Sequence, residues 1–452
     1  MDNNKDNNNY YYPINYREVS MIKKGFIALL LIGILFSSIS SCAGKKKDEG
    51  TSGGPVKIIF YLWDDPAYKP LIDYYNSSQS DIIVDAKYLA TNEYEVKIST
   101  LLAGGAEMDG YMQKRSTDIF VHYNNGYIVP LDDLCKKYNF NLDAIKGYKS
   151  AITIDNKTMA IPFRGASYYT YYNKKIFNEL NIPTPETYVE KGEWTWPKFI
   201  EVAENISRKM PGTYGGFLYT WGSNNVMPAL QNGMKFIDEN GNLDINDTLI
   251  NCFKYRKELE QNKAIMPLTE TKVTKTHYSK AFYSGKVGML VIGEWFPGFM
   301  KSGSDDKLLE GFTWNDWALT RMPCDETPYR TFGNPTFSHV HSNSKNKDAV
   351  FKFIAWMGGP DGAMKVAANG LLPAYITDDV KNEFKKILPD ASSLKYYTED
   401  RIVNTQFYNK YGTKVEGELA AIMEEYLSED MTDAQLKTLI EQRLKQVAMQ
   451  IQ

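Results

Sequence analysis

The spacing of apolar and polar residues predicts alternating strands and helices from residue 56 onward. Residues 56–63 are β-prone throughout and half apolar, which favours a strand. Residues 70–75 begin with proline and carry an apolar stripe at helical spacing. The pattern then predicts a strand at 82–88, a helix at 94–102 and a strand at 118–121. This order of elements is typical of a parallel α/β sheet.

Ligands of such sheets bind beyond the carboxyl ends of the strands. Here the three ends carry Trp63-Asp64-Asp65, the turn at 91–93, and His122-Tyr123. We therefore expect these side chains to lie along one edge of the sheet, where a ligand would bind.

The later part of the chain continues the mixture of strands and helices. Thr195 is placed to cap a helix that runs to about Lys209, and residues 432–435 to cap a long C-terminal helix. The other predicted elements are a helix from Asp132, a strand at 161–163, an extended aromatic segment at 168–172, a glycine-framed buried strand at 285–293 and a helix at 347–357. Glu294-Trp295 follows the buried strand directly.

The segment 21–42 has the layout of a secretory signal peptide. Lys23 and Lys24 precede an apolar run at 26–36 that is too short to span a bilayer, and small residues lead into Cys42. The cysteine makes the segment resemble a bacterial lipoprotein signal, in which Cys42 is lipidated and becomes the mature N-terminus. The alternative is an uncleaved anchor helix that ends at a cysteine by chance. Residues 1–20 read as a mis-annotated extension, and residues 43–55 as a flexible tether.

Composition describes an ordinary globular protein long enough for two or three domains. The net charge is −3, and without a basic stripe the chain is a poor candidate for nucleic-acid binding. Besides Cys42, the chain has Cys135, Cys252 and Cys324, too few for a disulfide scaffold and at no zinc spacing. We expect them to be buried, with one pair open to bridging. His339 and His341 are spaced to share one strand face, but no metal and no cofactor are expected.

The aromatic content is unusual, with 32 Tyr, 21 Phe and 8 Trp. Rings with a polar edge are suited to packing on sugars or to binding peptides. The other interpretation, a core and loops rich in tyrosine, is the better one for most individual rings.

Several short motifs follow one another in a recognisable order. They are Trp63-Asp64-Asp65, Asp118-Ile119-Phe120 with 126–132, Ile161-Pro162-Phe163 with 171–174, 183–185 with 194–197, 285–289 through 293–295, 344–349, and 370–373. By this order, which covers about residues 56–450, the chain resembles the family 1 extracellular solute-binding proteins of ABC importers, which include the maltose-binding type. Two features depart from the family pattern. Thr117 replaces a common proline, and 104–116 is longer than the usual turn and reads as an insertion near the cleft.

The resemblance implies an α/β fold of the type II-like periplasmic-binding-protein kind. Its two lobes would each be a mostly parallel sheet flanked by helices, and they would close on a ligand by hinge motion. By analogy, lobe 1 takes 56–163 plus 328–374, and lobe 2 takes 168–322 plus 380–452. Hinges are expected near 164–166, 323–329 and 373–375.

Sugar binding needs flat aromatic faces together with polar groups for the ring hydroxyls. Trp295 is the first candidate, because it follows a buried strand where maltose-binding relatives place a stacking tryptophan. Trp63 and Trp221 are further candidate platforms, whereas Trp194, Trp196 and Trp356 are expected in the core. The polar candidates are Asp64, Asp65, Arg164, His122, Asn224, Glu294 and Asn334. Arg164 could bind a sugar or a carboxylate, or form an interlobe salt bridge.

The expected function is therefore a lipid-anchored extracytoplasmic receptor, not an enzyme, that delivers a mono- or oligosaccharide to an ABC importer. Its partners would be the solute, two permease subunits and the membrane, with the receptor itself a monomer. One alternative is a surface glycan-capture or signalling lipoprotein without a permease. Another is a secreted glycoside hydrolase that uses Asp64 with Glu294 as its carboxylate pair. No serine-hydrolase, zinc-protease or phosphate-loop motif supports an enzyme.

Overall fold

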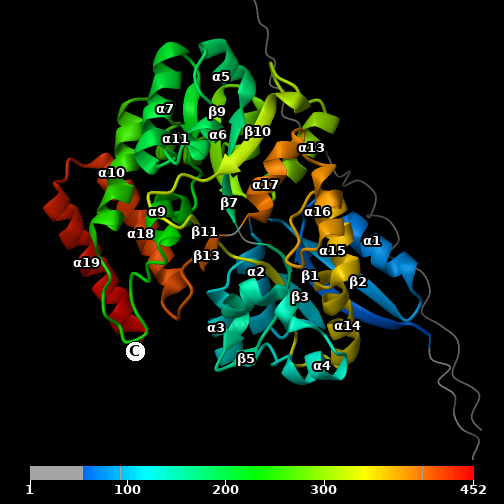
Figure 1. Ribbon diagram of the computed structural model, residues 1–452. Coiled ribbons are helices and arrows are strands. Elements are labelled where there is room, and N and C mark those ends of the chain that lie inside the picture. The colour runs from blue at the N-terminus through cyan, green and yellow to red at the C-terminus, as the bar shows by residue number, and fades with distance from the viewer. Residues whose placement is uncertain (1–53, 92, 166, 400, 452) are drawn as a thin grey trace, which may run out of the picture. The chain divides into compact units, whose positions relative to one another are not determined.

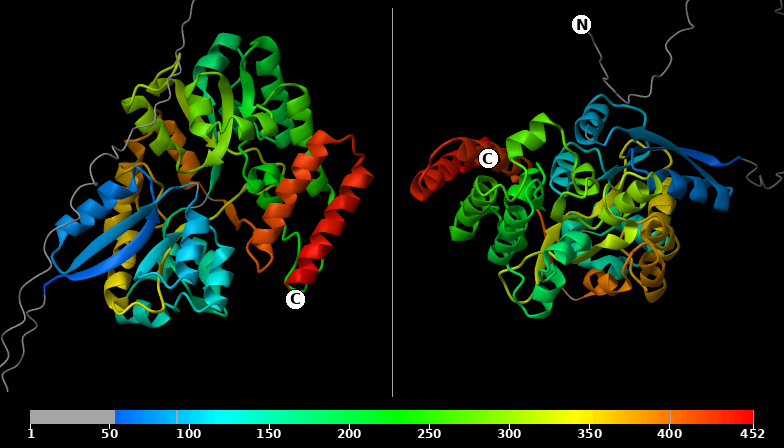
Figure 2. Two further views of the ribbon diagram at one scale, coloured as in Figure 1. Left: turned by 180° about the vertical axis from the view of Figure 1, so that it is seen from behind. Right: turned by 90° about the horizontal axis from the view of Figure 1, so that it is seen from above.

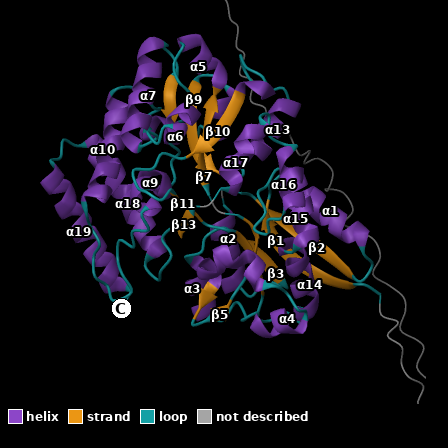
Figure 3. Ribbon diagram, viewed as in Figure 1, coloured by secondary structure: helices purple, strands orange, loops and turns teal. Residues whose placement is uncertain are grey.

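The computed structural model describes residues 54–91, 93–165, 167–399 and 401–451 (Figure 1). The predicted signal peptide, Cys42 and nearly all of the predicted tether lie outside the described residues. Within the described part of the chain, no helix is long and apolar enough to cross a membrane. The body is α/β, with strands gathered into two principal sheets that are flanked by helices (Figure 3).

The first sheet has the strand order β2-β1-β3-β12-β6. Its strands are β1 (Val56–Trp63), β2 (Ile82–Leu89), β3 (Gly110–Gln113), β12 (Thr336–Val340) and β6 (Ile161–Arg164). β1 pairs in parallel with β2 and β3, whereas β12 runs antiparallel to β3 and β6. The helices that pack with these strands include α1 (Tyr68–Ser78), α2 (Tyr94–Ala103), α14 (Lys347–Gly358) and α15 (Pro360–Ala368).

The third predicted strand was misplaced. Residues 118–121 belong to α3 (Asp118–Asn124), whose Ile119 and His122 are buried at helical spacing. The strand beside β1 is instead β3, inside the segment 104–116 that sequence marked as an insertion. Gly110 permits this pairing, because a Cβ there would lie 2.6 Å from the carbonyl oxygen of His339 on the neighbouring strand.

The second sheet has the order β10-β7-β9-β8. Its strands are β7 (Tyr168–Asn173), β8 (Tyr214–Phe217), β9 (Val287–Gly293) and β10 (Trp317–Arg321). Only the β8–β9 pairing is parallel, since β7 runs antiparallel to both β9 and β10. β10, β9 and β8 therefore run in one direction and β7 runs against them, and the two-lobed α/β class with helix-flanked sheets is confirmed.

Helices of the second lobe follow the predicted caps. Thr195 accepts a hydrogen bond from the Lys198 amide at 3.3 Å at the start of α7 (Trp196–Lys209). Thr432 and Gln435 form a capping box at the start of α19 (Asp433–Gln450). α19 lies beside α18 (Gly412–Ser428), as both views of Figure 2 show in orange and red. α5 (Lys174–Leu180) and α13 (Phe296–Asp305) follow β7 and β9 directly.

A short ribbon and one isolated bridge occur where the chain passes between the two sheets. β11 (Arg330–Gly333) pairs in parallel with β13 (Ile402–Thr405), and Arg164 forms an isolated bridge with Pro373. The chain thus passes between the sheets after β6, before β12 and beyond residue 373. The predicted lobe boundaries and hinges are compatible with these crossings and stay predictions.

The remaining elements complete the two lobes. They are α4 (Asp132–Lys137), β4 (Thr153–Ile154), β5 (Lys157–Thr158), α6 (Pro185–Glu190), α8 (Gly222–Asn225), α9 (Met227–Gln231), α10 (Asp247–Gln261), α11 (Leu268–Val273), α12 (Tyr278–Tyr283), α16 (Asp378–Lys385), α17 (Leu394–Thr398), and the 3₁₀ helices Leu142–Ile152, Trp314–Asp316 and Ala391–Ser393.

Much of the aromatic content lies in the core. The largest fully buried side chains include Tyr68, Tyr94, Tyr111, Tyr169, Tyr171, Tyr172, Tyr397 and Tyr411, so the tyrosine-rich core is correct for these rings. Trp194 and Trp196 are buried as expected, and Trp356 is partly buried against Tyr75.

The three cysteines of the described body are free thiols, so the bridge that sequence left open does not form among them. Cys135 and Cys252 are buried, whereas Cys324 is half-buried. His339 is buried, with Nε2 facing Gln113 Oε1 and Nδ1 facing the Met159 carbonyl. No group of three or more His, Cys, Asp or Glu side chains suited to a metal occurs among the described residues.

Candidate functional site

Trp295 stands at the exit of β9, where the strand turns into α13. Gly293 allows the indole to fold back over the strand end, because a Cβ at that position would lie 2.0 Å from the Trp295 ring. The indole Nε1 donates a hydrogen bond to the Tyr278 hydroxyl at 2.9 Å, which fixes the plane of the ring. Trp295 remains half-buried, so part of its surface is open to a ligand.

Other aromatic rings surround Trp295. The Trp221 ring centroid lies 6.0 Å from that of Trp295, and Trp221 is 38% exposed. Tyr168 meets Trp295 edge to face at 5.8 Å, and Tyr278 meets Trp221 in the same way at 5.8 Å. Trp221 and Trp295 therefore form a partly open aromatic surface backed by tyrosines, which suits the apolar C–H faces of sugar rings.

A buried ion pair joins the ends of the two sheets. Arg164 Nε lies 3.0 Å from Glu294 Oε1, and the two side chains are 9% and 1% exposed. The same guanidinium donates from Nη1 to the Tyr68 hydroxyl at 3.0 Å and lies over the Trp295 ring at 5.5 Å. Burial raises the pKa of Glu294 to about 7, against the opposing charge of Arg164. Arg164 is thus engaged by the protein itself, as in the interlobe alternative that the sequence suggested.

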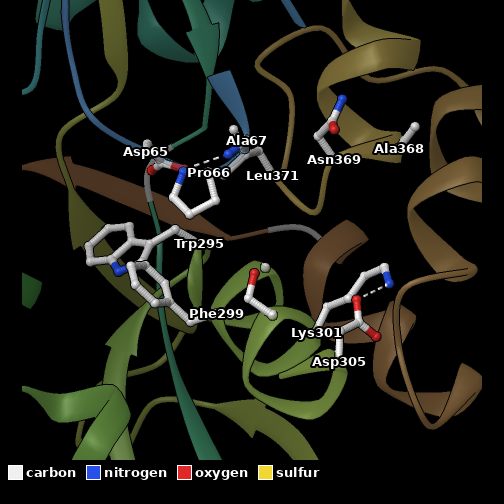
Figure 4. Close-up of a pocket in the computed structure, with 12 residues that line it drawn as sticks. Asp65, Pro66, Ala67, Trp295, Phe299, Lys301, Asp305, Ala368, Asn369 and Leu371 are labelled. Atoms are coloured by element: carbon white, nitrogen blue, oxygen red, sulfur yellow. Dashed lines mark hydrogen bonds and ion pairs between the residues drawn. The ribbon is translucent and has the colours of Figure 1, made fainter. Parts of the chain in front are cut away.

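Trp295 also lines a pocket of about 170 Å³ (Figure 4). Three separate segments form it: residues 65–67 after β1, α13 with its preceding tryptophan, and the end of α15 with the turn that follows. Its apolar walls include Phe299 and Leu371, and its polar groups include Asp65 and Asn369. The pocket lies beyond the carboxyl end of β1, where ligands of α/β sheets bind.

On one side of this pocket, two glycines allow the backbone of the turn after α15 to lie close to the backbone of α13. Gly370 has φ +84°, and a Cβ there would lie 2.9 Å from the Cα of Gly298. Glycine is needed at 370 for both reasons, and this brings the turn after α15 into contact with α13.

The polar groups of the pocket are mostly hydrogen-bond acceptors. Asp65 Oδ1 accepts from the Ala67 amide at 3.0 Å, and Oδ2 has no partner among the described residues. Asn369 Nδ2 donates to the Lys365 carbonyl at 2.8 Å, which leaves its own oxygen as the available group. Lys301 and Asp305 pair with each other at 2.8 Å on the rim, as the dashed line in Figure 4 marks.

A second group of charged residues bridges the two lobes. Arg115 of the first lobe lies 3.1 Å from Glu416 Oε2 on α18, and Thr413 donates to Asp118 Oδ1 at 3.1 Å. Burial raises the pKa of Glu416. Burial likewise raises the pKa of Glu95 to about 7, although Lys114 lies 3.9 Å away. These pairs connect α18 with the start of α3.

Five predicted residues gather in this region: Asp65, Arg164, Trp221, Glu294 and Trp295. Trp63 lies close by but is 3% exposed, with its ring packed edge to face against Tyr68 and Tyr94 and with Lys114 Nζ 4.9 Å from its centroid. It is a buried support of Tyr68, which in turn holds Arg164. Asp64 is exposed and does not line the pocket.

The other three polar candidates lie away from the pocket. His122 is buried against the Tyr111 hydroxyl at 2.8 Å, and burial lowers its pKa to about 4. Asn224 is buried beside Trp196 and lines a separate cavity of about 20 Å³. Asn334 is half-buried between β11 and β12 and does not line the pocket. His122 was chosen from the misplaced strand, and so its expected position at a strand end was wrong.

Sequence reasoning missed Tyr68, Tyr278, Phe299 and Asn369. Asn369 immediately precedes the motif at 370–373, so that motif was the signal that could have identified it. Phe299 follows Trp295 by one helical turn, a spacing that places both on one face. Tyr68 and Tyr278 carry no sequence signal, because their roles arise from contacts across 96 and 17 positions of the chain.

Comparisons with known proteins identify the family and the fold of the chain. The family described as bacterial extracellular solute-binding protein matches residues 63–364. A Rhizobium etli sugar transporter, solved in an open conformation, is similar at 27% identity with a TM-score of 0.71, covering 86% of this chain and 99% of that one. An ABC substrate-binding protein from Listeria monocytogenes has a TM-score of 0.73 at 17% identity, covering 88% and 99%.

A curated relative from Brucella abortus, described as a binding protein, is 21% identical in an alignment that covers 63% of this chain and 72% of the relative. The family match extends over more than half of the sequence and includes both Trp63 and Trp295. The chain belongs to the bacterial extracellular solute-binding protein family.

Proposed function

We propose that this protein is an extracytoplasmic receptor that binds a saccharide between its lobes and delivers it to an ABC importer. The observation that carries the proposal is the meeting of Trp295 and Asp65 in one pocket. A sugar ring needs an apolar face and acceptors for its hydroxyls, and these two residues supply both. Each well-placed hydrogen bond contributes about 1 kcal/mol.

The ligands of similar structures support a saccharide or a related polyol. The Listeria protein was solved in complex with cycloalternan, a protein from Thermotoga lettingae with α-D-tagatose, and one from Agrobacterium vitis with D-mannitol. Their TM-scores to this chain are 0.73, 0.71 and 0.63. These ligands share closely spaced hydroxyls and carry no formal charge.

A binding role accounts for the site better than catalysis does. The hydrolase alternative requires Glu294 as an acid or a base, yet this side chain is 1% exposed and faces Arg164 at 3.0 Å. A catalytic carboxyl must reach the reacting bond. The family and the similar structures are likewise binding proteins.

Membrane attachment through Cys42 belongs to the same proposal. A lipid anchor would hold the receptor near its permease and raise the local concentration of each for the other. We expect Cys42→Ala to abolish partition of the protein into a detergent phase, whereas Cys324→Ala should leave partition unchanged. Equal partition of both variants would contradict the anchor.

Calorimetric titration of the purified protein with a panel of neutral saccharides tests the proposal. We expect one ligand per protein and a change in tryptophan fluorescence. Trp295→Ala should weaken binding by at least about 1 kcal/mol through the lost stacking. Trp356→Ala is the matched control, because Trp356 packs against Tyr75 in the first lobe and does not line the pocket. Equal affinity of wild type and Trp295→Ala would show that Trp295 is not part of the binding site.

A further inference from the structure

The cations next to the Trp295 pocket are already paired with carboxylates of the protein. Arg164 lies over the Trp295 ring but is held by Glu294 at 3.0 Å and donates to Tyr68. Lys301, the lysine of the pocket lining, lies 2.8 Å from Asp305. Both cations therefore already have a carboxylate partner, and neither is free to neutralise an anionic ligand.

If Arg164 turned toward a ligand, Glu294 would lose its counter-ion. Glu294 is 1% exposed, and a buried carboxylate that loses its counter-ion pays a large desolvation cost. The guanidinium would also lose the Tyr68 hydroxyl and its position over the indole. Since Arg164 occupies one face of Trp295, a ligand must stack on the remaining surface of that ring.

The carboxylates of the pocket outnumber its cations. Among the charged lining residues, one lysine stands against two aspartates, Asp65 and Asp305. Asp65 Oδ2 has no partner among the described residues, whereas Asp305 faces Lys301. An anion drawn to Lys301 would therefore still face two like charges, and the one of these without a counter-ion, Asp65, is partly buried.

We infer that this pocket selects uncharged saccharides and rejects sugars that carry a carboxylate or a phosphate. The inference rests on the proposed function and narrows its ligand class. The hydroxyls of a neutral sugar donate to Asp65 and Asn369, while its C–H face packs on Trp295. An acidic sugar instead adds a negative charge beside the Asp65 and Asp305 carboxylates.

Matched pairs of neutral and acidic sugars test this inference. The purified protein is titrated at about pH 7.5, where sugar acids are ionised, with glucose and glucuronate, galactose and galacturonate, and maltose and maltobionate. For each pair that binds, we expect the acid to be weaker by at least about ten-fold, with a smaller difference at high salt. An acid that binds as tightly as its neutral counterpart overturns the inference but leaves saccharide binding intact. If no sugar binds, both the proposed function and the inference are contradicted.

Two variants test whether the pocket charges cause the discrimination. Glu294→Gln frees the guanidinium of Arg164, and Asp65→Asn removes the unpaired carboxylate, so each should reduce the ratio of neutral to acidic affinity by at least about three-fold. Asp65 is partly exposed, so its variant remains informative if the buried Glu294 variant does not fold. The control is Glu201→Gln, which removes an exposed carboxylate on α7. Ratios that stay equal in both test variants and the control would overturn the electrostatic explanation.

Discussion

The buried carboxyl of Glu294 should make the stability of the protein fall as pH rises. Burial raises its folded-state pKa from 4.5 to about 7, although Arg164 lies beside it. A carboxyl with a raised folded pKa contributes stability that is fully present below its unfolded pKa. That contribution is lost as pH rises through the folded pKa, since the unfolded chain then releases the proton more readily.

The size of the effect follows from the two pKa values. Between pH 5.5 and 8.5, the linkage relation gives a loss of about 2 kcal/mol in the free energy of unfolding from Glu294 alone. Glu294→Gln keeps the shape of the protonated carboxyl but cannot ionise. Its stability should therefore lack this part of the pH dependence.

Urea unfolding followed by circular dichroism at the two pH values measures the difference. Wild type should lose about 2 kcal/mol more than Glu294→Gln over this range. Glu95, whose pKa is also raised to about 7, titrates in both proteins and cancels in the comparison. Equal losses in wild type and variant would show that Glu294 is ionised at both pH values, and that Arg164 outweighs the burial.

Three further predictions concern a close backbone approach, an ion pair between the lobes, and the relative contributions of two tryptophans to saccharide binding. Gly370→Ala should lower the unfolding free energy by about 1 kcal/mol or more, and by more than Gly126→Ala does. Both glycines have positive φ, but only Gly370 also lies against another backbone segment. Equal losses of stability in thermal melts would contradict the close approach. Arg115→Ala should enlarge the radius of gyration of the ligand-free protein in X-ray scattering, because it breaks the contact with Glu416 across the lobes; an unchanged radius would show that this pair does not hold them. Trp221→Ala should weaken saccharide binding less than Trp295→Ala does, since Trp221 does not line the pocket, and calorimetry that gives the reverse order would move the site toward Trp221.

The first half of the first sheet could be predicted from local pattern. The strands at 56–63 and 82–88 and the helix at 94–102 agree with β1, β2 and α2 within one residue at each end. In these segments the apolar period and the β-branched content indicate the same structure. Local preference and tertiary contacts therefore agreed.

The third strand shows where local pattern was insufficient. Residues 118–121 are β-prone, yet burial of Ile119 and His122 at helical spacing makes them part of α3. The strand at 110–113 is short and contains glycine, so its signal was weak. Its place depends on Gly110, where an added Cβ would meet His339, Val350 and Phe60, all distant in the sequence.

The candidate site could be predicted in part, because strand ends are visible in the sequence. Asp65 and Trp295 were found in this way, since each lies two residues beyond the end of a strand. Sequence left the role of Arg164 open between a ligand contact and a salt bridge. The choice depends on Glu294, which lies 130 positions further along the chain and 3.0 Å away in space.

Titration calorimetry of the wild-type protein with neutral saccharides, combined with tryptophan fluorescence, tests the central claim most directly. We predict that at least one neutral mono- or oligosaccharide binds with one-to-one stoichiometry, and that its binding changes the emission of wild type more than that of Trp295→Phe. Heat and fluorescence that stay at baseline for every neutral sugar, in protein that melts cooperatively, would contradict it.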